Sequence, residues 1–455
     1  MDFKSYRCYN TYNMSLNNNN KNNGADEKNK TYKFLFVGHE SLSGDLAWQV
    51  AKENHSVKIY ISNPEEQDVY DGFLEKIKDW KNYINWADVV IFDDIGFGEE
   101  ADKLRATGKL VVGGSKYTDQ LENDRDFGQS EMRRLGMLTL PNWYFLSYDE
   151  ALKFLEENPG RYVYKPSGHI DSDWKGLLFV AKEEDGKDLY EILKSNKKNL
   201  AKKIKEFQLQ KFASGVEIAV GTFFNGNDFT YPVNINFEHK KLFPGDIGPM
   251  TGEMGTLMYW SNPNMFFNTT LFKIKDDLKK SGYRGYIDIN CIANARGIYP
   301  LEWTCRFGYP TISIQMEGIT NYWGEFLYKM AKGEPTDLKT KKGFQIGVVC
   351  GVPPFPYEDD SEAELYKDLS ILFKKPASDG IHLGDVKKID GVWRVAGKIG
   401  YTLVVTGSGT TVKDARRQVY NRIDNIMLQN MFYRTDIGLK WDEDSDKLQT
   451  WGYLH

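Results

Sequence analysis

Short apolar segments alternate with helix-like segments over residues 32–112, and this alternation limits the possible folds more than any other feature of the sequence. The predicted strands are Tyr32–Val37, Val57–Ser62, Ala87–Phe92 and Leu110–Val112. Between the first two strands, Leu46–Glu53 carries apolar residues every three to four positions, which predicts a helix. Strands that alternate with helices are typical of βαβ units, so we expect an α/β fold that begins with a parallel sheet.

The loop after the first predicted strand, Gly38–Gly44 (GHESLSG), fits neither the pattern GxxxxGK[ST] nor the pattern GxGxxG. The sequence therefore contains no P-loop and no dinucleotide-binding fingerprint at the position where one is expected.

Helices and strands continue to mix further along, without an internal repeat. The predicted helices are Glu122–Leu135, Leu189–Glu206, Leu271–Ser281, Tyr322–Lys332 and Val412–Leu428. The predicted strands are Tyr162–Lys165, Leu177–Ala181, Gln208–Phe212, Glu217–Asn225, Gly285–Ile292 and Ile298–Thr304. Gly333-Glu334-Pro335 is a candidate domain boundary, because glycine and proline interrupt regular structure.

Composition excludes several classes of protein. The 455 residues include 59 Lys and Arg against 64 Asp and Glu, a net charge of −5. Free nucleic acid is an unlikely partner for such a chain, because phosphate contacts need a basic excess. No run approaches about 18 consecutive apolar residues, so we expect no membrane span. Four cysteines without a CxxC pair, Cys8, Cys291, Cys305 and Cys350, argue against a disulfide framework and a zinc site and fit a reducing cytoplasm.

Residues 1–31 are predicted to be a disordered extension. Asn17–Gly24 is polar and low in complexity, so it cannot repay the entropy of ordering. The extension has no continuous apolar region, so we do not expect a secretory signal. Met14 is an alternative start, and the sequence does not choose between the two methionines.

The segment 285–304 predicts a hairpin that places acidic residues on one face. With a turn over Ala293–Gly297, Asp288 lies directly opposite Glu302. Opposed residues have Cβ atoms about 5 Å apart, and like charges there destabilise a sheet unless a cation lies between them. Carboxylates combined with phosphate oxygens are the usual ligands of Mg²⁺. A metal site is one interpretation; a solvated face, or a register that separates the two acids, is the other.

Two further segments suit a bound phosphate or a closely approaching ligand. Lys165 ends a predicted strand and precedes the loop Gly168–Gly176, so its ammonium group could hold a phosphate beneath that loop; a solvated lysine is the alternative. Residues 245–255 (GDIGPMTGEMG) gather four glycines around Asp246 and Glu253, which allows close approach of the backbone to a ligand; a plain surface loop is the alternative.

Three ordered motifs resemble the ATP-grasp superfamily, and within it the phosphoribosylamine–glycine ligase family. They are Gly248–Gly255 (GPMTGEMG), Leu301–Gly308 (LEWTCRFG) and Asn430–Gly438 (NMFYRTDIG). The family's versions read close to GPNTGGMG, LEFNCRFGDPE and GMFYRKDIG. The resemblance runs from about residue 32 to residue 440. It implies that ATP phosphorylates a carboxylate, and that an amine then attacks the acyl phosphate to form an amide, with release of ADP and phosphate.

The resemblance also implies roles for individual residues. Glu302 and Asp288 match metal ligands, for Mg²⁺ or Mn²⁺, and Thr304 stands where the family has a metal-binding Asn. Residues at ATP-contacting positions are Arg125 and Lys165 for the phosphates, Gln210, Lys211, Phe212 and Ala213 for adenine, and Glu217 for the ribose. Residues expected near the reacting groups are Arg306, Glu253 and Asp246.

The implied architecture is an α+β ATP-grasp fold with a parallel-sheet N-terminal domain, a central ATP-grasp domain with a mobile lid, and a small C-terminal α+β domain. The expected limits are an N-terminal domain over 32–118, an ATP-grasp domain over 119–336 with a lid at about 161–226, a C-terminal domain over 337–440, and a tail over 441–455.

The departures from the family pattern lie mainly on the amine side. Ser41–Trp48 (SLSGDLAW) replaces a GGREHALAW-like run that helps to hold the ribose phosphate substrate. Glu253 replaces a glycine, and an anionic Glu253 is expected to repel a phosphorylated substrate and attract an amine. Expected substrates are an amino acid such as glycine and an amine acceptor. A changed acceptor, such as a modified nucleotide (one within DNA included) or a peptide amine, and a non-catalytic ATP-binding protein remain alternatives; the oligomeric state is not readable.

Overall fold

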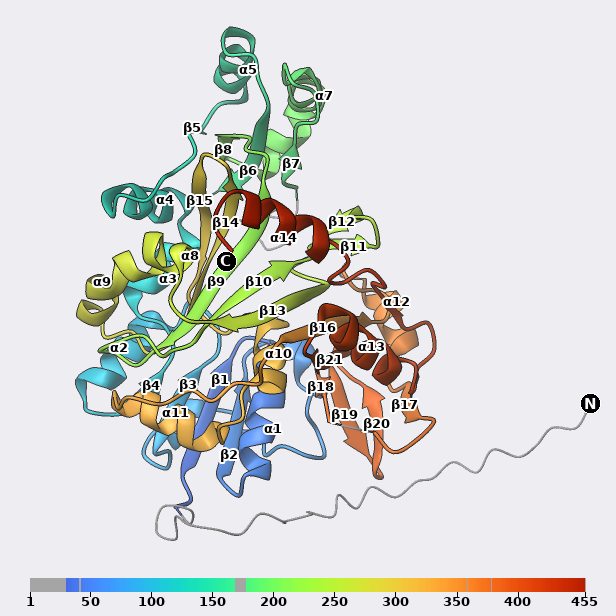
Figure 1. The fold of residues 1–455 in the computed structure, drawn as a ribbon. Helices are drawn as coiled ribbons and strands as arrows, with labels where there is room; N and C mark the ends of the chain where they lie inside the picture. The colour runs from blue at the N-terminus through green and yellow to red at the C-terminus, as the bar shows by residue number, and fades with distance from the viewer. Residues whose placement is uncertain (1–29, 41, 168–176, 358, 378, 455) are drawn as a thin grey trace, which may run out of the picture.

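The computed structural model describes residues 30–40, 42–167, 177–357, 359–377 and 379–454. The predicted disordered extension therefore lies almost wholly outside the described residues, and so does the loop Gly168–Gly176. Within the described residues the strands form five sheets, which Figure 1 shows in their spatial arrangement.

The N-terminal sheet is parallel, with the strand order β2-β1-β3-β4. Its elements are β1 (Lys33–Gly38), α1 (Gly44–Lys52), β2 (Ser56–Ile61), η1 (Pro64–Glu66), η2 (Trp80–Tyr83), β3 (Val89–Phe92), α2 (Gly98–Ala106) and β4 (Leu110–Val112). Phe34 and Phe36 pack into one hydrophobic core, whereas Leu35 and Val37 pack into another. In β1, residues 34–37 are all apolar because both faces of the sheet are covered. The predicted parallel α/β sheet is confirmed.

The prediction of one continuous helix over Glu122–Leu135 is wrong. The chain forms α3 (Lys116–Asn123) and α4 (Arg125–Arg134), which meet at Asp124. The Asp124 carboxylate accepts hydrogen bonds from the backbone N–H groups of Asp126 (3.1 Å) and Phe127 (3.0 Å), so it caps α4. The break places Arg125 at the first position of α4.

An antiparallel sheet, which we call the lid sheet, forms the upper lobe in Figure 1 with the strand order β5-β8-β6-β7. Its elements are β5 (Asn142–Phe145), α5 (Tyr148–Glu157), β6 (Tyr162–Ser167), β7 (Phe179–Val180), α7 (Lys187–Lys203) and β8 (Glu206–Lys211). Phe207 and its neighbours form a hydrophobic core separate from the main one. Compared with the predicted lid at about 161–226, this sheet starts earlier, whereas β9 (Val216–Phe224) joins the central sheet because Ile218 and Val220 pack in the main core.

The central sheet has nine strands in the order β15-β14-β9-β10-β13-β16-β21-β18, with β23 paired to β16. Its other strands are β10 (Val233–Glu238), β13 (Gly255–Ser261), β14 (Gly285–Asn294), β15 (Gly297–Thr304), β16 (Phe344–Gly351), β18 (Ile381–Leu383), β21 (Leu403–Gly409) and β23 (Phe432–Tyr433). The candidate boundary at 333–335 falls between β13 and β16, which pair antiparallel within this sheet. The expected limits of the three domains stay a prediction.

The remaining elements flank the central sheet. Helical elements are α8 (Met265–Thr269), η3 (Leu271–Ile274), α9 (Lys275–Lys280), α10 (Thr311–Gly318), α11 (Trp323–Lys332), α12 (Asp360–Tyr366), α13 (Val412–Ile423) and α14 (Trp441–Thr450). A small sheet contains β17 (Ser370–Phe373), β19 (Val386–Ile389), β20 (Val392–Val395) and β22 (Ile426–Met427), and a ribbon contains β11 (Lys241–Phe243) and β12 (Ile247–Met250).

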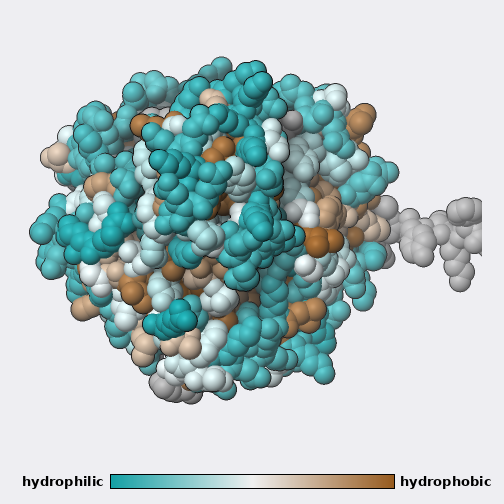
Figure 2. Space-filling view, turned by 90° about the horizontal axis from the view of Figure 1, so that it is seen from above, coloured by the Kyte–Doolittle hydropathy of each residue, from teal (hydrophilic) through white to brown (hydrophobic). Residues whose placement is uncertain are grey.

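The molecular surface is mostly hydrophilic when seen from the lid end, with hydrophobic residues single or in small groups (Figure 2). No helix among the described residues is long and apolar enough to cross a bilayer.

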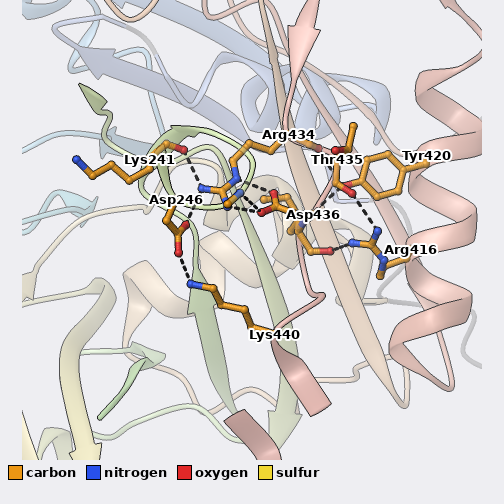
Figure 3. Close-up of polar contacts among 10 residues, drawn as sticks. Lys241, Asp246, Arg416, Tyr420, Arg434, Thr435, Asp436 and Lys440 are labelled. Atoms are coloured by element: carbon orange, nitrogen blue, oxygen red, sulfur yellow. Dashed lines mark hydrogen bonds and ion pairs between the residues drawn. The ribbon is translucent and has the colours of Figure 1, made fainter. Parts of the chain in front are cut away.

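One buried arginine ties the glycine-rich segment 245–255 to the C-terminal part of the chain. Arg434 is fully buried and donates bidentately to Asp436, at 2.8 and 2.7 Å. Its Nη1 donates to Asp246 and to the carbonyl of Lys241, both at 2.9 Å (Figure 3). Lys440 pairs with the other oxygen of Asp246. Burial opposes ionisation of Asp436, but the hydrogen bonds from Arg434 outweigh it and hold the pKa of this carboxyl at about 2.

We predict that Arg434→Met destabilises the protein by about 3–5 kcal/mol, because it leaves Asp246 and Asp436 without their buried partner. Denaturant and thermal unfolding measure the change. Lys440→Met is the matched control, since Lys440 is exposed and its pair with Asp246 contributes only about 0–1 kcal/mol. Equal losses in the two variants would contradict the role assigned to Arg434.

Candidate active site

Charged side chains from the lid sheet, the central sheet and α4 converge on Glu302 of β15. Arg125 Nη1 lies 3.8 Å from one carboxylate oxygen, and Lys240 Nζ, just after β10, lies 3.6 Å from the other. Lys165 on β6 is buried, and its positive charge helps to lower the pKa of Glu302. Three cations from separate segments therefore surround one carboxylate.

Lys240 lies within ion-pair distance of three carboxylates in this charge cluster. Its Nζ lies 2.9 Å from Glu217 and 3.4 Å from Glu238, in addition to Glu302. Burial opposes the charge of Lys240, but the three carboxylates together raise its pKa well above the ordinary value. Sequence analysis missed Lys240 and Glu238. The available signal was a charged run, Glu238-His239-Lys240, directly at the end of an apolar strand.

The pKa values reflect this convergence. Burial opposes ionisation of Glu302, yet Lys240, Arg125 and Lys165 outweigh it and hold the pKa of the carboxyl at about 2. Burial, and then the positive charge of Arg125, lowers the pKa of Lys165 to about 8. The site thus combines a fixed carboxylate with a lysine that can lose its proton in mildly alkaline solution.

The predicted register of the 285–304 hairpin is wrong. Asp288 pairs with Thr304, and Asn290, not Asp288, pairs with Glu302. The connecting loop is only Ala295 and Arg296, and an irregularity beside Asn290 shifts the register again. A bulge places an extra residue in one strand and so changes which side chains face each other. Asp288 and Glu302 are consequently diagonal neighbours on one face, where side chains are about 7–8 Å apart.

The hairpin face nevertheless fits a hard cation. Asp288 Oδ1 and Asn290 Oδ1 are buried and have no hydrogen-bond partner among the described residues. Burial, and then the nearby negative charge of Glu238, raises the pKa of Asp288 to about 8. Carboxylate and amide oxygens are the donors that Mg²⁺ prefers, and Mg²⁺ also needs oxygens from a substrate. Asn290 is a candidate ligand that the sequence analysis did not single out.

The segment predicted to meet adenine leaves the lid sheet at the end of β8. Gln210 is buried, and its side-chain N–H₂ group has no partner among the described residues. Phe212 lies 3.7 Å from the Arg161 guanidinium, and Lys211 lies 4.5 Å from the ring of Tyr162. Ala213 follows as the chain turns into β9, where Glu217 is engaged by Lys240. The unpartnered amide of Gln210 is the feature here that best suits a polar heterocycle.

Arg306 lies on the side of the site that faces the N-terminal sheet. Its Nε is 3.2 Å from Glu122 and 3.6 Å from Asp94, and its guanidinium is 5.9 Å from the centre of the Tyr309 ring. It contacts carboxylates and not the cluster around Lys240. A role for Arg306 near the reacting groups stays a prediction.

Glu253 and Asp246 differ sharply in environment. Glu253 is 8% exposed, and burial together with the charge of Glu238 raises its pKa well above the ordinary value. Burial therefore disfavours the anionic form of Glu253, on which the expected repulsion of a phosphorylated substrate depends. Arg434 pairs with one carboxylate oxygen of Asp246 and Lys440 with the other, so Asp246 holds the loop in place. A catalytic role for Asp246 stays a prediction.

Residues 123–312 match the model of the phosphoribosylglycinamide synthetase ATP-grasp (A) domain. The chain has the ATP-grasp fold. Among proteins of this fold, it is similar to phosphoribosylamine–glycine ligases. It is 24% identical over 431 residues to the phosphoribosylamine–glycine ligase of Streptococcus pneumoniae, which covers 90% of this chain and 99% of that protein.

Solved structures give the same fold. The phosphoribosylamine–glycine ligase of Thermotoga maritima superposes with a TM-score of 0.66 at 19% identity, covering 89% of this chain and 100% of that one. The biotin carboxylase domain of Hydrogenobacter thermophilus 2-oxoglutarate carboxylase, solved with MgADP, ADP and bicarbonate, superposes with a TM-score of 0.58 at 12% identity, covering 94% and 96%. The predicted ATP-grasp architecture is confirmed.

We predict that the affinity for ATP falls as the pH rises through about 8. The pKa of Lys165 is lowered to about 8, so its ammonium group is present below that pH and is lost above it. Calorimetric titration of ATP at a series of pH values between about 6.5 and 9.5 measures the effect. Lys165→Arg should bind ATP without this step, because guanidinium stays protonated throughout. A wild-type affinity that is flat across the series would contradict the assignment of Lys165 to the phosphates.

Proposed function

We propose that the protein is an ATP-dependent ligase that joins a carboxylate to an amine. The observation that carries this proposal is the convergence of Arg125, Lys165 and Lys240 on the acidic face that holds Glu302. Partly buried cations that lie close together suit the polyphosphate of ATP, since such groups stabilise charge on a transferring phosphoryl group. Carboxylates on the adjacent strands suit the metal ion that accompanies ATP.

ATP is proposed to lie between the lid sheet and the central sheet. Gln210, Lys211, Phe212 and Ala213 border the base, Glu217 the ribose, and Arg125 and Lys165 the phosphates. Glu217 pairs with Lys240 through Oε1 at 2.9 Å, and the carboxylate has further acceptor sites for a ribose hydroxyl.

Glu302 and Asp288 are the proposed metal ligands, and Asn290 or Thr304 complete the same face. A bound Mg²⁺ supplies positive charge that offsets the charge on the phosphates. Arg125 and Lys165 orient the terminal phosphate toward the carboxylate substrate. The carboxylate oxygen attacks the γ-phosphorus, ADP leaves, and the resulting acyl phosphate is attacked by the amine nitrogen. The C–O bond to phosphate breaks, inorganic phosphate leaves, and the nitrogen loses a proton.

The substrate pair named for the relatives, glycine and phosphoribosylamine, is the first pair to test. Glycine can be varied to other amino acids and the amine to other acceptors in the same assay. ADP release that requires both a carboxylate and an amine, with the amide confirmed by mass, is the expected outcome.

We predict that Glu302→Gln lowers ADP formation by about 100-fold or more, because it removes a charge that holds the metal ion. The fold should be retained, as thermal unfolding would verify. Glu443→Gln, which alters an exposed carboxylate paired with Lys447 on α14, is the matched control and should turn over normally. Unchanged turnover in Glu302→Gln would remove Glu302 from the metal site. ATP binding without ADP release for any substrate pair would instead support a non-catalytic protein.

A further inference from the structure

Buried carboxyl groups gather where the N-terminal sheet meets the segment 383–401. Glu66, Asp93 and Asp385 are 1%, 2% and 4% exposed. Asp93 directly follows β3, and Glu66 ends the turn of helix that follows β2. In open α/β sheets, ligands bind beyond the carboxyl ends of the parallel strands. The acids therefore occupy the edge of the sheet where a substrate is expected.

Each of the three acids is held in place by hydrogen bonds to neighbouring segments. Asp93 accepts from the hydroxyl (2.5 Å) and the N–H (3.2 Å) of Ser43, Glu66 from the N–H of Lys398 (3.1 Å), and Asp385 from the N–H of Tyr401 (2.9 Å). Among the described residues, none of them forms an ion pair with a lysine or arginine. The acids are thus fixed, but their charge is not compensated by a cationic side chain.

Two lysines of the segment 383–401, Lys387 and Lys398, form ion pairs with other carboxylates. Lys398 Nζ pairs with Glu65 at 3.1 Å and with Asp360 at 2.9 Å. Lys387 Nζ pairs with Asp68 at 2.8 Å. Among the described residues, these two lysines are thus already paired with carboxylates outside the group Glu66, Asp93 and Asp385.

A buried tyrosine lies among the same carboxyls. Burial, and then the charges of Asp385, Asp45 and Asp93, raises the pKa of Tyr70 well above its ordinary value. Asp45 is hydrogen-bonded to a ring nitrogen of His382 at 2.8 Å. Burial raises the pKa of Asp93 to about 7, and the adjacent charge of Asp94 adds to this rise. Burial raises the pKa of Glu66 to about 7 as well, with a smaller contribution from Glu40.

Unpartnered buried oxygens connect this cluster with the centre around Lys240. Glu66 Oε2, the Tyr401 hydroxyl and Glu253 Oε1 are buried without a hydrogen-bond partner among the described residues. Burial, and then the charges of Glu253 and Asp385, raises the pKa of Tyr401, so its hydroxyl lies near both acids. Buried polar atoms are nearly always hydrogen-bonded in native proteins, so such a series indicates a ligand that supplies donors.

The missing ligand is unlike a metal ion. The described residues contain no group of three or more His, Cys, Asp or Glu side chains arranged to hold one. The three acids come from separate segments: Glu66 ends η1, Asp93 follows β3, and Asp385 precedes β19. Ammonium groups spaced along a flexible chain carry both the positive charge and the hydrogen-bond donors that these oxygens lack.

We propose that the amine substrate is a di- or polyamine without a phosphate group, held by Glu66, Asp93 and Asp385 through the ammonium group that does not react. The proposal rests on the proposed ligase function and names its acceptor. The unprotonated terminal nitrogen attacks the carbonyl carbon of the acyl phosphate. The bond from that carbon to the phosphate oxygen breaks, inorganic phosphate leaves with the electron pair, and the attacking nitrogen releases a proton to water. Glu253 and Tyr401 border the path between the retained ammonium group and the reacting end.

The test measures binding and turnover separately, with the full chain. Spermidine and putrescine are titrated calorimetrically into the wild type and into Glu66→Gln, Asp385→Asn and Glu65→Gln. Glu65 neighbours Glu66 but is exposed and paired with Lys398, so it is the matched control. Binding to the wild type, weakened about 10-fold or more in Glu66→Gln and Asp385→Asn but not in Glu65→Gln, supports the proposal. Unchanged ATP affinity in all three variants shows that they are folded.

Absence of spermidine and putrescine binding to the wild type, or equal binding in all variants, would overturn the proposal. In the turnover arm, MgATP is supplied with a panel of amino acids and with either spermidine, putrescine or phosphoribosylamine. ADP release with phosphoribosylamine and not with the polyamines would overturn the acceptor assignment while leaving the ligase function intact. Failure to bind ATP would instead overturn the ligase function itself, which keeps the two conclusions separate.

Discussion

The pairing of Lys240 with Glu217, Glu238 and Glu302 is the interaction on which the rest of the site depends. Three carboxylates on strands β9, β10 and β15 of one sheet repel each other, and Lys240 offsets that repulsion from a position just beyond β10. Arg125 adds charge from the start of α4, and Lys165 adds charge from the lid sheet. The central sheet can therefore present an acidic face to a metal ion and a cationic rim to phosphates within the same small volume.

The scaffold keeps these groups in register through two separate means. The lid sheet has its own hydrophobic core, so Lys165 and Gln210 are positioned independently of the main core. The glycine-rich segment, in contrast, is fixed by charge, because the buried guanidinium of Arg434 binds Asp246 and Asp436 at once. The segment 245–255 therefore has a backbone that a ligand can approach closely and a position that Arg434 fixes.

The two ends of the proposed substrate path have opposite electrostatic character. Around Glu302 the cations Arg125, Lys165 and Lys240 suit a polyphosphate, whereas around Glu66 and Asp385 uncompensated acids suit ammonium groups. Such a separation orients a reaction, since each substrate is attracted to one end and repelled from the other. Similarity in sequence to phosphoribosylamine–glycine ligases is compatible with this division, because the fold and the nucleotide side can persist while the acceptor side changes.

The parallel N-terminal sheet and the ATP-grasp fold could be predicted from the sequence, because apolar runs such as Tyr32–Val37 and ordered motifs such as Leu301–Gly308 are local properties of the chain. Which charged side chains meet depends on how distant segments pack. The short loop at Ala295 and the irregularity beside Asn290 set the hairpin register, which strand pairing and twist determine and local pattern does not. Likewise Glu66 and Asp385 are far apart in sequence, and they meet because the segment 383–401 packs against the edge of the N-terminal sheet.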